Sequence, residues 1–196
     1  NPYNNPTGKR IRPLLLLLTV EAAVGNWEVG VFAAAAVEIL NNFSLVHDDI
    51  QDQSDIRHGR ETVWQDWGVA QAINTGDAMF ALSYRALEYL SRTDIDPHTL
   101  IEIWRVYNRT ILELTRGQHL DMNFETRDNV GGEEYLSMGG GKTAALLSCC
   151  TQIGALIGAD DISISERYAD FGIGVGLAFQ IRDDILGIWG DAEKTG

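Results

Sequence analysis

The chain has 196 residues, of which 45% are hydrophobic, and its formal net charge is −13. That length supports one sizeable hydrophobic core, and the hydrophobic content excludes a disordered chain. Because so acidic a surface repels nucleic acid and anionic lipid, neither is expected as a partner.

Apolar periodicity predicts an all-α chain. The first helix follows Pro13, a residue that is favoured in a first helical turn. No alternating pattern long enough for a useful strand is present. The predicted helices span residues 14–23, 29–52, 70–91, 97–117, 142–156 and 163–188. The predicted loops span residues 53–60, 92–96, 127–133 and 158–161.

Three glycines interrupt the last predicted helix at Gly172, Gly174 and Gly176. Glycine is a poor helix former, so its repetition here favours close helix packing or a kink near a ligand. The adjacent cysteines Cys149 and Cys150 are expected to be small apolar residues of a helix, because adjacent cysteines rarely form a disulfide. Free thiols favour a reducing cytoplasm as the location of the protein.

Neither a signal peptide nor a membrane span is predicted. The longest apolar run near the start covers residues 14–20, which is far too short to cross a bilayer. The abrupt ends at Asn1 and Gly196 lead us to expect that residues 1–196 form a single domain, incomplete at both ends.

An acidic cluster, Asp48-Asp49-Ile50-Gln51-Asp52, ends the second predicted helix. Asp48 and Asp52 are four residues apart and share one face of that helix. Their mutual repulsion, together with a helix dipole that disfavours anions at a C-terminus, favours a bound cation. Mg²⁺ suits such a site, because it binds a few carboxylates and completes its shell with phosphate oxygens and water. Alone, the cluster is equally consistent with a solvated acidic helix end.

A second pair of adjacent aspartates, Asp183 and Asp184, follows the apolar stretch 171–179 on the last predicted helix. A second pair on a second long apolar helix makes a purely solvated role for both less plausible. If the two clusters face each other, they can hold a small group of Mg²⁺ ions and one diphosphate between them.

Basic residues occur near the first cluster and near the start of the chain. Arg57 and Arg60 follow the cluster, and Lys9, Arg10 and Arg12 reverse the local charge. Arg and Lys suit phosphate oxygens. On spacing alone, however, a solvated basic turn is the simpler explanation of the N-terminal group.

The run Gly139-Gly140-Gly141-Lys142-Thr143 invites comparison with a nucleotide-binding P-loop. Leu136 stands where that motif needs glycine, and no strand precedes the run, so we exclude a Walker A site. Lys142 and Thr143 can still donate hydrogen bonds to a phosphate at a helix N-terminus.

Five ordered motifs together resemble the trans-isoprenyl diphosphate synthases, also called polyprenyl synthetases. They are residues 8–13 (GKRIRP), 48–52 (DDIQD), 117–121 (GQHLD), 142–143 (KT) and 179–184 (FQIRDD). The resemblance covers nearly the whole chain. It implies a bundle of long helices around a deep apolar channel, usually in a homodimer.

The resemblance also implies two diphosphate substrates and a cluster of about three Mg²⁺ ions with bound diphosphate. Metal ligands on the allylic diphosphate would be Asp48, Asp52 and Asp183, with Asp49 and Asp184 assisting. Contacts to that diphosphate or its surroundings would come from Arg57, Lys142 and Gln180.

The implied reaction begins when metal ions and cations stabilise the departing diphosphate, which generates an allylic cation. The double bond of isopentenyl diphosphate then attacks, and a proton is lost. Thr143 and Gln180 would offer oxygen dipoles near the cation, and the apolar channel would exclude water.

The implied isopentenyl diphosphate site comprises Lys9, Arg12, Asn41 and His58, and it departs from the family pattern. Asn41 stands where the family has histidine, and His58 stands where it has a second arginine. Losing two charge-assisted contacts would weaken this site by a few kcal/mol. Gly187 replaces a third aspartate of the second motif, as in several family branches.

Product length is indicated by Phe43 and the small residue Ser44 beside it. Phe43 lies roughly 7 Å down the helix from Asp48, which in the family goes with products of about C15–C25, best matched by C20. Ordinary core packing explains Phe43 equally well.

Two other functions remain open on the sequence. A class I terpene synthase or cyclase would ionise one allylic diphosphate, and Asn41 and His58 favour it while Lys9 and Arg12 oppose it. A non-catalytic partner subunit would have no need of the clustered, mutually repelling aspartates.

Overall fold

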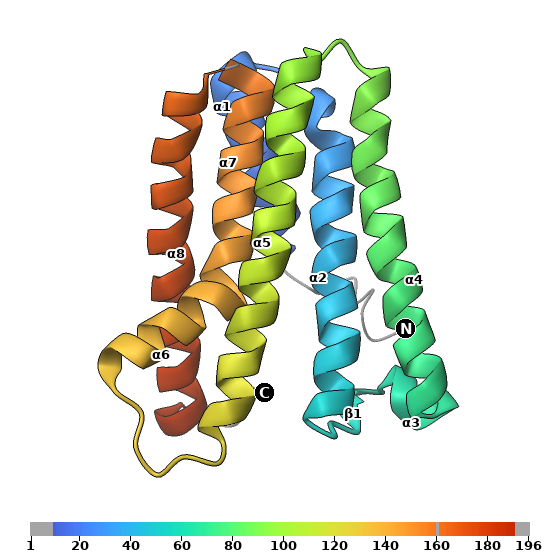
Figure 1. Ribbon diagram of the computed structural model, residues 1–196, viewed down its shortest axis with the longest axis vertical. Helices are drawn as coiled ribbons and strands as arrows, with labels where there is room; N and C mark the ends of the chain where they lie inside the picture. Colours follow the sequence, from blue (N-terminus) through green and yellow to red (C-terminus); the bar gives the residue numbers. More distant parts are fainter. Residues whose placement is uncertain (1–9, 160, 191–196) are drawn as a thin grey trace.

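The computed structural model describes residues 10–159 and 161–190, and it confirms the all-α prediction (Figure 1). The α-helices are α1 (Ile11–Val24), α2 (Val31–Gln51), α3 (Val63–Trp67), α4 (Val69–Glu88), α5 (Pro97–Phe124), α6 (Gly132–Gly139), α7 (Ala145–Ala159) and α8 (Ile162–Trp189). The 3₁₀ turns η2 (Trp27–Gly30) and η3 (Tyr89–Arg92) and the π-helical turn η4 (Gly140–Ala144) adjoin them. Two short strands, β1 (Ile56–Arg57) and β2 (Arg60–Glu61), pair antiparallel.

Capping residues set several helix ends. The Asp96 side chain accepts a hydrogen bond from the His98 backbone N–H at 2.7 Å, and Pro97 opens α5. The Asp161 side chain caps α8 in the same way through the Ser163 N–H at 2.8 Å. Gly25 ends α1 at φ 71°, a left-handed conformation that glycine adopts without strain.

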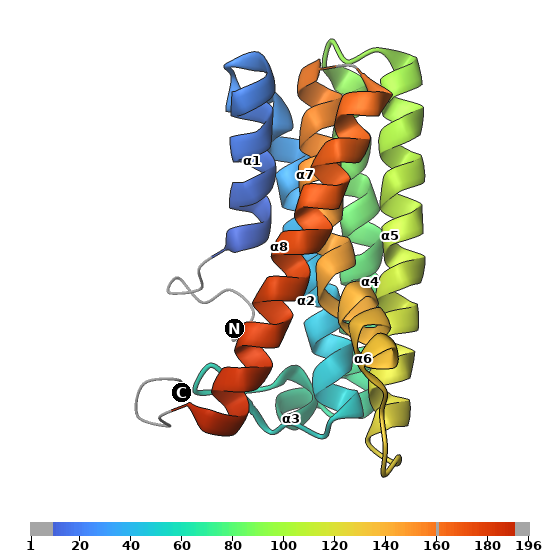
Figure 2. The same cartoon turned by 90° about the vertical axis from the view of Figure 1, so that its left-hand side faces the viewer.

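The long helices run roughly side by side, with α1 on one face of the layer formed by the others (Figures 1 and 2). Helix α7 is central: it packs on α1, α5 and α8, and most of its residues are buried. The core that surrounds it includes Leu16, Leu40, Tyr107, Leu146 and Ile153, all at most 1% exposed. This burial explains why α7 reads as apolar all round.

Two of the glycines of α8 permit a close approach to α7 and η4. A Cβ atom on Gly172 would lie 2.5 Å from Ser148 Cα, and one on Gly176 would lie 2.4 Å from Ala144 Cα. Gly174 instead faces open space. The prediction of close packing is therefore confirmed for Gly172 and Gly176 alone.

Several predicted boundaries were wrong. Helix α5 does not end at Gly117 but continues to Phe124, and the predicted helix at 142–156 begins as the π-helical turn η4. Helix α6 was not predicted. Gly117 stays inside α5 because the η4 backbone packs directly on it, an approach that only glycine permits.

Two helical stretches, Trp27–Gln51 and Gly132–Ala159, are by length and composition apolar enough to cross a membrane. Of their most apolar windows, 39% and 72% respectively are buried inside the bundle. Core helices of water-soluble bundles have the same composition, so these two stretches do not establish a membrane span.

Candidate functional site

A cavity of about 440 Å³ opens between the C-terminal half of α2, the C-terminal half of α5 and the turn η4. That volume lies in the range of small-molecule sites. The predicted site residues that line it are Arg12, Asn41, Phe43, Ser44, Asp48, Lys142 and Thr143. Leu114, Met122 and Leu146 add apolar wall, so the cavity combines charged groups with an apolar surface.

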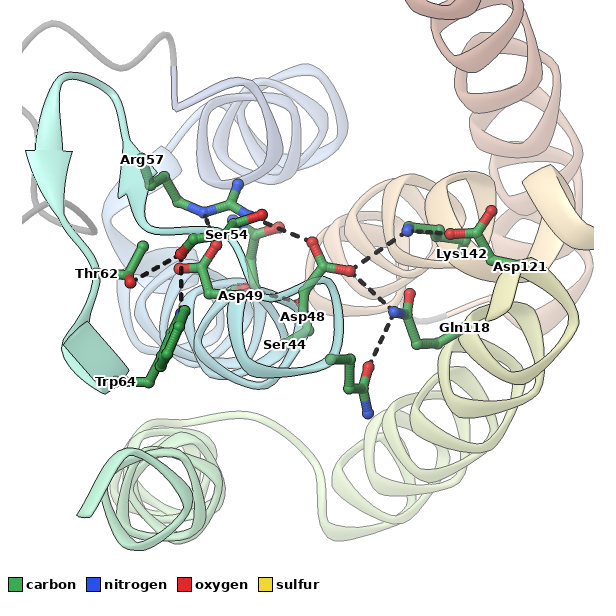
Figure 3. A network of polar contacts seen from close by, with 12 residues as sticks. Ser44, Asp48, Asp49, Ser54, Arg57, Thr62, Trp64, Gln118, Asp121 and Lys142 are labelled. Atoms are coloured by element: carbon green, nitrogen blue, oxygen red, sulfur yellow. Dashed lines mark hydrogen bonds and ion pairs between the residues drawn. The ribbon is translucent and has the colours of Figure 1, made fainter. Parts of the chain in front are cut away.

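Asp48 lies at the centre of a network of cationic and amide donors (Figure 3). Its Oδ1 accepts from Gln118 Nε2 at 2.9 Å and lies 3.3 Å from Lys142 Nζ. Its Oδ2 lies 3.2 Å from Arg57 Nη2. Gln118 also donates to Gln51 at 2.9 Å, which fixes the amide between α5 and α2. The network brings α2, α5 and η4 together at one carboxylate.

Asp49 plays a different part, because it is 0% exposed and pairs with Arg57 at 2.6 Å. Removing one partner of so buried a pair is costly, so this contact holds the loop after α2 on the bundle. Thr62 and Trp64 anchor the same loop by donating to the Ser54 carbonyl oxygen at 2.9 and 2.8 Å (Figure 3). Arg57 is thereby held beside Asp48.

Lys142 bridges the first cluster to α5. Its ammonium group contacts Asp121 as well as Asp48. Burial lowers the pKa of Lys142, but the hydrogen bond to Asp121 and the charge of Asp48 outweigh burial and raise it above its ordinary value. Lys142 is therefore a fixed positive charge at the wall of the cavity.

The second acidic cluster is connected to Thr143, the residue that follows Lys142 in the turn η4. Thr143 donates its hydroxyl proton to Gln180 Oε1, and Gln180 Nε2 donates to Asp184 Oδ1 at 2.9 Å. Asp184 Oδ2 accepts from the hydroxyl of Tyr135 on α6. Asp183, its neighbour on α8, is solvent-exposed. The turn η4 thus directs Lys142 to one cluster and Thr143 to the other.

The carboxylates fit magnesium only if other ligands complete the shell. Within residues 10–159 and 161–190, no three His, Cys, Asp or Glu side chains are grouped so as to hold a metal by themselves. Mg²⁺ seldom needs such a cage, because it takes one or two carboxylates together with substrate phosphates and water. Asp48 and Asp52 on one helix face, with the exposed Asp183 on α8, are a donor set of that kind.

Asp52 shows the repulsion expected in such a cluster. Partial burial and the charge of Asp48 raise the pKa of Asp52 above its ordinary value. A raised pKa means that the folded protein holds the proton more tightly than the unfolded chain does. Ionised Asp52 therefore opposes folding once the pH rises above its folded pKa.

We expect Asp52→Asn to raise the melting temperature near neutral pH, because it removes the repulsion between Asp48 and Asp52. The rise should be at most about 2 °C, because solvent partly screens the two carboxylates from each other. The gain should vanish below a pH of about 3, where Asp52 is protonated in both states. Melting curves of both proteins across this pH range check the prediction. An Asp52→Asn protein less stable at neutral pH would contradict it.

Arg12, on α1, is mostly buried at the cavity. Burial lowers its pKa, against the opposing charges of Cys150, Glu38 and Asp183. Its Nε atom is buried and has no hydrogen-bond partner among the described residues. A buried, unsatisfied guanidinium N–H at a cavity calls for an anionic ligand.

The structure does not bring all predicted residues to the cavity. His58 lies at the exposed tip of the β1–β2 hairpin at φ 51°, followed by Gly59 at φ 74°, the backbone of a tight hairpin turn. Asp52 and Asp183 are exposed, outside the lining residues. Lys9 lies outside the described residues.

Sequence reasoning left three residues of these networks without a role. Gln118 and Asp121 belong to α5 and were noticed only as part of a motif. Asp121 lies one helical turn after Gly117, and this spacing is the signal that could have linked it to Lys142. Nothing in the sequence indicated a role for Tyr135, because α6, the helix to which it belongs, was not predicted.

Comparison with known sequences agrees with the geometry. The polyprenyl synthetase family model matches residues 1–196. A (2E,6E)-farnesyl diphosphate synthase of Mycobacterium bovis is 42% identical over 195 residues, which are 100% of this chain and 53% of that protein. A geranylgeranyl diphosphate synthase of Saccharolobus solfataricus is 41% identical over 189 residues, which are 96% of this chain and 57% of that protein.

Solved structures give the same result. A polyprenyl synthetase from Streptomyces coelicolor matches with TM-score 0.90 and 42% identity, over 98% of this chain and 56% of its own. A geranylgeranyl pyrophosphate synthetase from Pyrococcus horikoshii matches with TM-score 0.89 and 38% identity, over 95% of this chain and 56% of its own. The chain spans about half the length of the relatives it matches. With a family model that matches residues 1–196 and a structural match over 98% of its length, this chain belongs to the polyprenyl synthetase family.

Proposed function

We propose that the protein is an Mg²⁺-dependent trans-prenyltransferase that condenses isopentenyl diphosphate with an allylic diphosphate. The product is a short- or medium-chain prenyl diphosphate, of about C20 as the position of Phe43 roughly 7 Å along α2 from Asp48 indicates. The observation that carries the proposal is the turn η4, whose adjacent residues connect to both acidic clusters. Lys142 contacts Asp48 of the first cluster, and Thr143 is linked to Asp184 of the second through Gln180.

The allylic diphosphate binds between the two clusters, with Asp48, Asp52 and Asp183 as metal ligands. Mg²⁺ supplies charge neutralisation for the departing diphosphate. Lys142 and Arg57 each contact Asp48 and add positive charge beside the leaving group. The allylic carbon–oxygen bond breaks, and both of its electrons leave with the diphosphate.

The second diphosphate binds at Arg12, with Lys9 and Asn41 as further contacts, while His58 at the exposed hairpin tip is left out of this site. The buried, unsatisfied Nε of Arg12 favours this second anion site in the same cavity as Asp48. The double bond of isopentenyl diphosphate attacks the allylic cation and forms the new carbon–carbon bond. Loss of a proton to the departed diphosphate restores a double bond.

Exposed apolar side chains bear on the assembly of the protein, and the two cysteines bear on its location. We propose a homodimer, because Ile101 and Leu112 on one face of α5 are 52% and 71% exposed, and Leu82 on α4 is 53% exposed. A cytoplasmic location is proposed because Cys149 and Cys150 are buried free thiols. Sedimentation equilibrium tests the dimer.

The decisive experiment incubates the full-length protein and Mg²⁺ with labelled isopentenyl diphosphate and, separately, dimethylallyl, geranyl and farnesyl diphosphates. Label in a longer prenyl diphosphate supports elongation and gives the product length. Diphosphate release from the allylic substrate alone, without incorporation, would support a cyclase and overturn the proposal. No turnover with any primer, despite Mg²⁺-dependent substrate binding, would support a non-catalytic subunit.

Phe43→Ala should shift the products toward longer chains. The Phe43 ring lines the cavity and packs against the Phe80 ring, with the two ring centroids 5.0 Å apart. Removing the ring opens space along the path of the growing chain, up to Phe80. Product sizing with farnesyl diphosphate as primer measures the shift, and Phe32→Ala, at a ring pair outside the cavity lining, is the control. An unchanged product distribution would exclude Phe43 as a determinant of length.

A further inference from the structure

A chain of hydrogen bonds runs from α6 through α8 to the cavity wall. Tyr135 donates to one oxygen of Asp184, Gln180 donates to the other, and Thr143 donates to Gln180. Of these four residues, Thr143 lines the cavity. The chain therefore ends in a hydroxyl oxygen at the place where the substrate would lie.

The donors and acceptors leave one orientation for the Gln180 amide. A carboxylate only accepts hydrogen bonds, so the Gln180 NH₂ group must face Asp184. Its carbonyl oxygen must then face Thr143, whose hydroxyl proton is used in that contact. The lone pairs of Thr143 Oγ1 are left to face the cavity, and such chains polarise one another.

Asp184 also has hydrogen-bond partners of a different kind from those of Asp48 in the first cluster. Asp48 accepts from the cations Arg57 and Lys142, whereas both oxygens of Asp184 accept from neutral donors. Burial and the hydrogen bond to Asp184 raise the pKa of Tyr135 to about 12, so its phenol remains a donor at neutral pH. Asp183, which is exposed beside it, keeps its oxygens accessible.

Helix α6 is anchored so that Tyr135 keeps its place. The Arg127 guanidinium pairs with both oxygens of Glu134 at 2.8 and 3.1 Å, and the Gly131 N–H donates to Glu134 at 3.0 Å. Gly139 lets the Gln180 side chain approach, since a Cβ there would lie 3.3 Å from Gln180 Cγ.

We propose that Tyr135 and Asp184 are positioning residues, which hold Gln180, and through it Thr143, so that the electron-rich Oγ1 of Thr143 faces the allylic cation. In this role Asp184 is not a metal ligand, and Asp183 alone of the pair binds metal. The inference rests on the proposed function, because it assigns the site of that cation.

Tyr135→Phe keeps the ring and removes the donor, so Asp184 is free to turn away from Gln180. We expect kcat for condensation to fall about tenfold or more, with KM for each diphosphate within about twofold of wild type. Tyr168→Phe, on α8 about 18 Å along the helix from Gln180, is the matched control. If Tyr135→Phe lowers kcat no more than Tyr168→Phe does, the proposal is overturned.

The metal role is tested without turnover, by calorimetric titration of inorganic diphosphate in the presence of Mg²⁺. Asp183→Asn should weaken this binding about tenfold or more, while Asp184→Asn should leave it within about twofold. Equal weakening by the two variants would make Asp184 a metal ligand and overturn the proposal. If the wild type forms no condensation product, the proposed function fails, but this titration still decides between the two roles of Asp184.

Discussion

Replacing Asp48 by asparagine should lower kcat/KM for condensation by about 10² to 10³, the usual effect of removing one preorganised group that stabilises transition-state charge. Asp48 is the carboxylate to which Arg57, Gln118 and Lys142 all converge. Asparagine keeps its size but has one acceptor oxygen and no charge, so it neither binds Mg²⁺ well nor holds the two cations together.

The Asp48→Asn protein should remain folded. Lys142 keeps its contact with Asp121, and Arg57 keeps its pair with Asp49 at 2.6 Å. The melting temperature should thus change little, and the loss should appear in the rate. Asp94→Asn, at an exposed position in the loop between η3 and α5, is the control. An Asp48→Asn enzyme within a few-fold of wild-type kcat/KM would contradict the assignment of the site.

Gly117→Ala should both destabilise the fold and displace the catalytic turn. A Cβ atom at Gly117 would lie 2.1 Å from Lys142 N and 2.5 Å from Gly141 C, and both are backbone atoms that cannot rotate away. Overpacking of this kind costs about 1–3 kcal/mol, and more where the backbone must move. Because the atoms displaced belong to η4, the contacts of Lys142 and Thr143 should loosen together.

Urea unfolding and Mg²⁺-dependent binding of inorganic diphosphate measure the two effects of Gly117→Ala. Gly174→Ala is the matched control, since a Cβ there meets nothing within 4 Å. Alanine at Gly174, inside a helix, should stabilise the protein by about 0.5–1 kcal/mol. Wild-type stability and binding in Gly117→Ala would mean that α5 and η4 are not packed as described.

The predicted helix ends were most accurate where neighbouring residues alone determine where a helix begins or ends. Asp161 begins α8 and Gly25 ends α1 by capping interactions that involve only neighbouring residues, so sequence was sufficient. The end of α5 was placed wrongly at Gly117 because a glycine in isolation reads as a stop. Its true reason is a partner backbone, Gly141, which lies far along the chain.

Helix α6 and the π-helical turn were missed for the same physical reason. Three consecutive glycines at 139–141 have low helix propensity, yet Gly139 and Gly141 are buried among α5, α8 and η4. Tertiary packing overrides the local preference. Tyr135 could not be assigned a role, because its partner Asp184 is 49 residues away.

The sequence by itself determined the helical bundle, the two aspartate pairs and the family, because these depend on periodicity and on short fixed spacings. Only the tertiary structure decided which aspartates are free and which are already hydrogen-bonded. Asp49 is buried against Arg57, Asp184 is held by Tyr135 and Gln180, and Asp48 meets Lys142 across 94 residues of chain. Charge and hydrogen-bonding partners are set by distance in space, which a spacing along the chain does not specify.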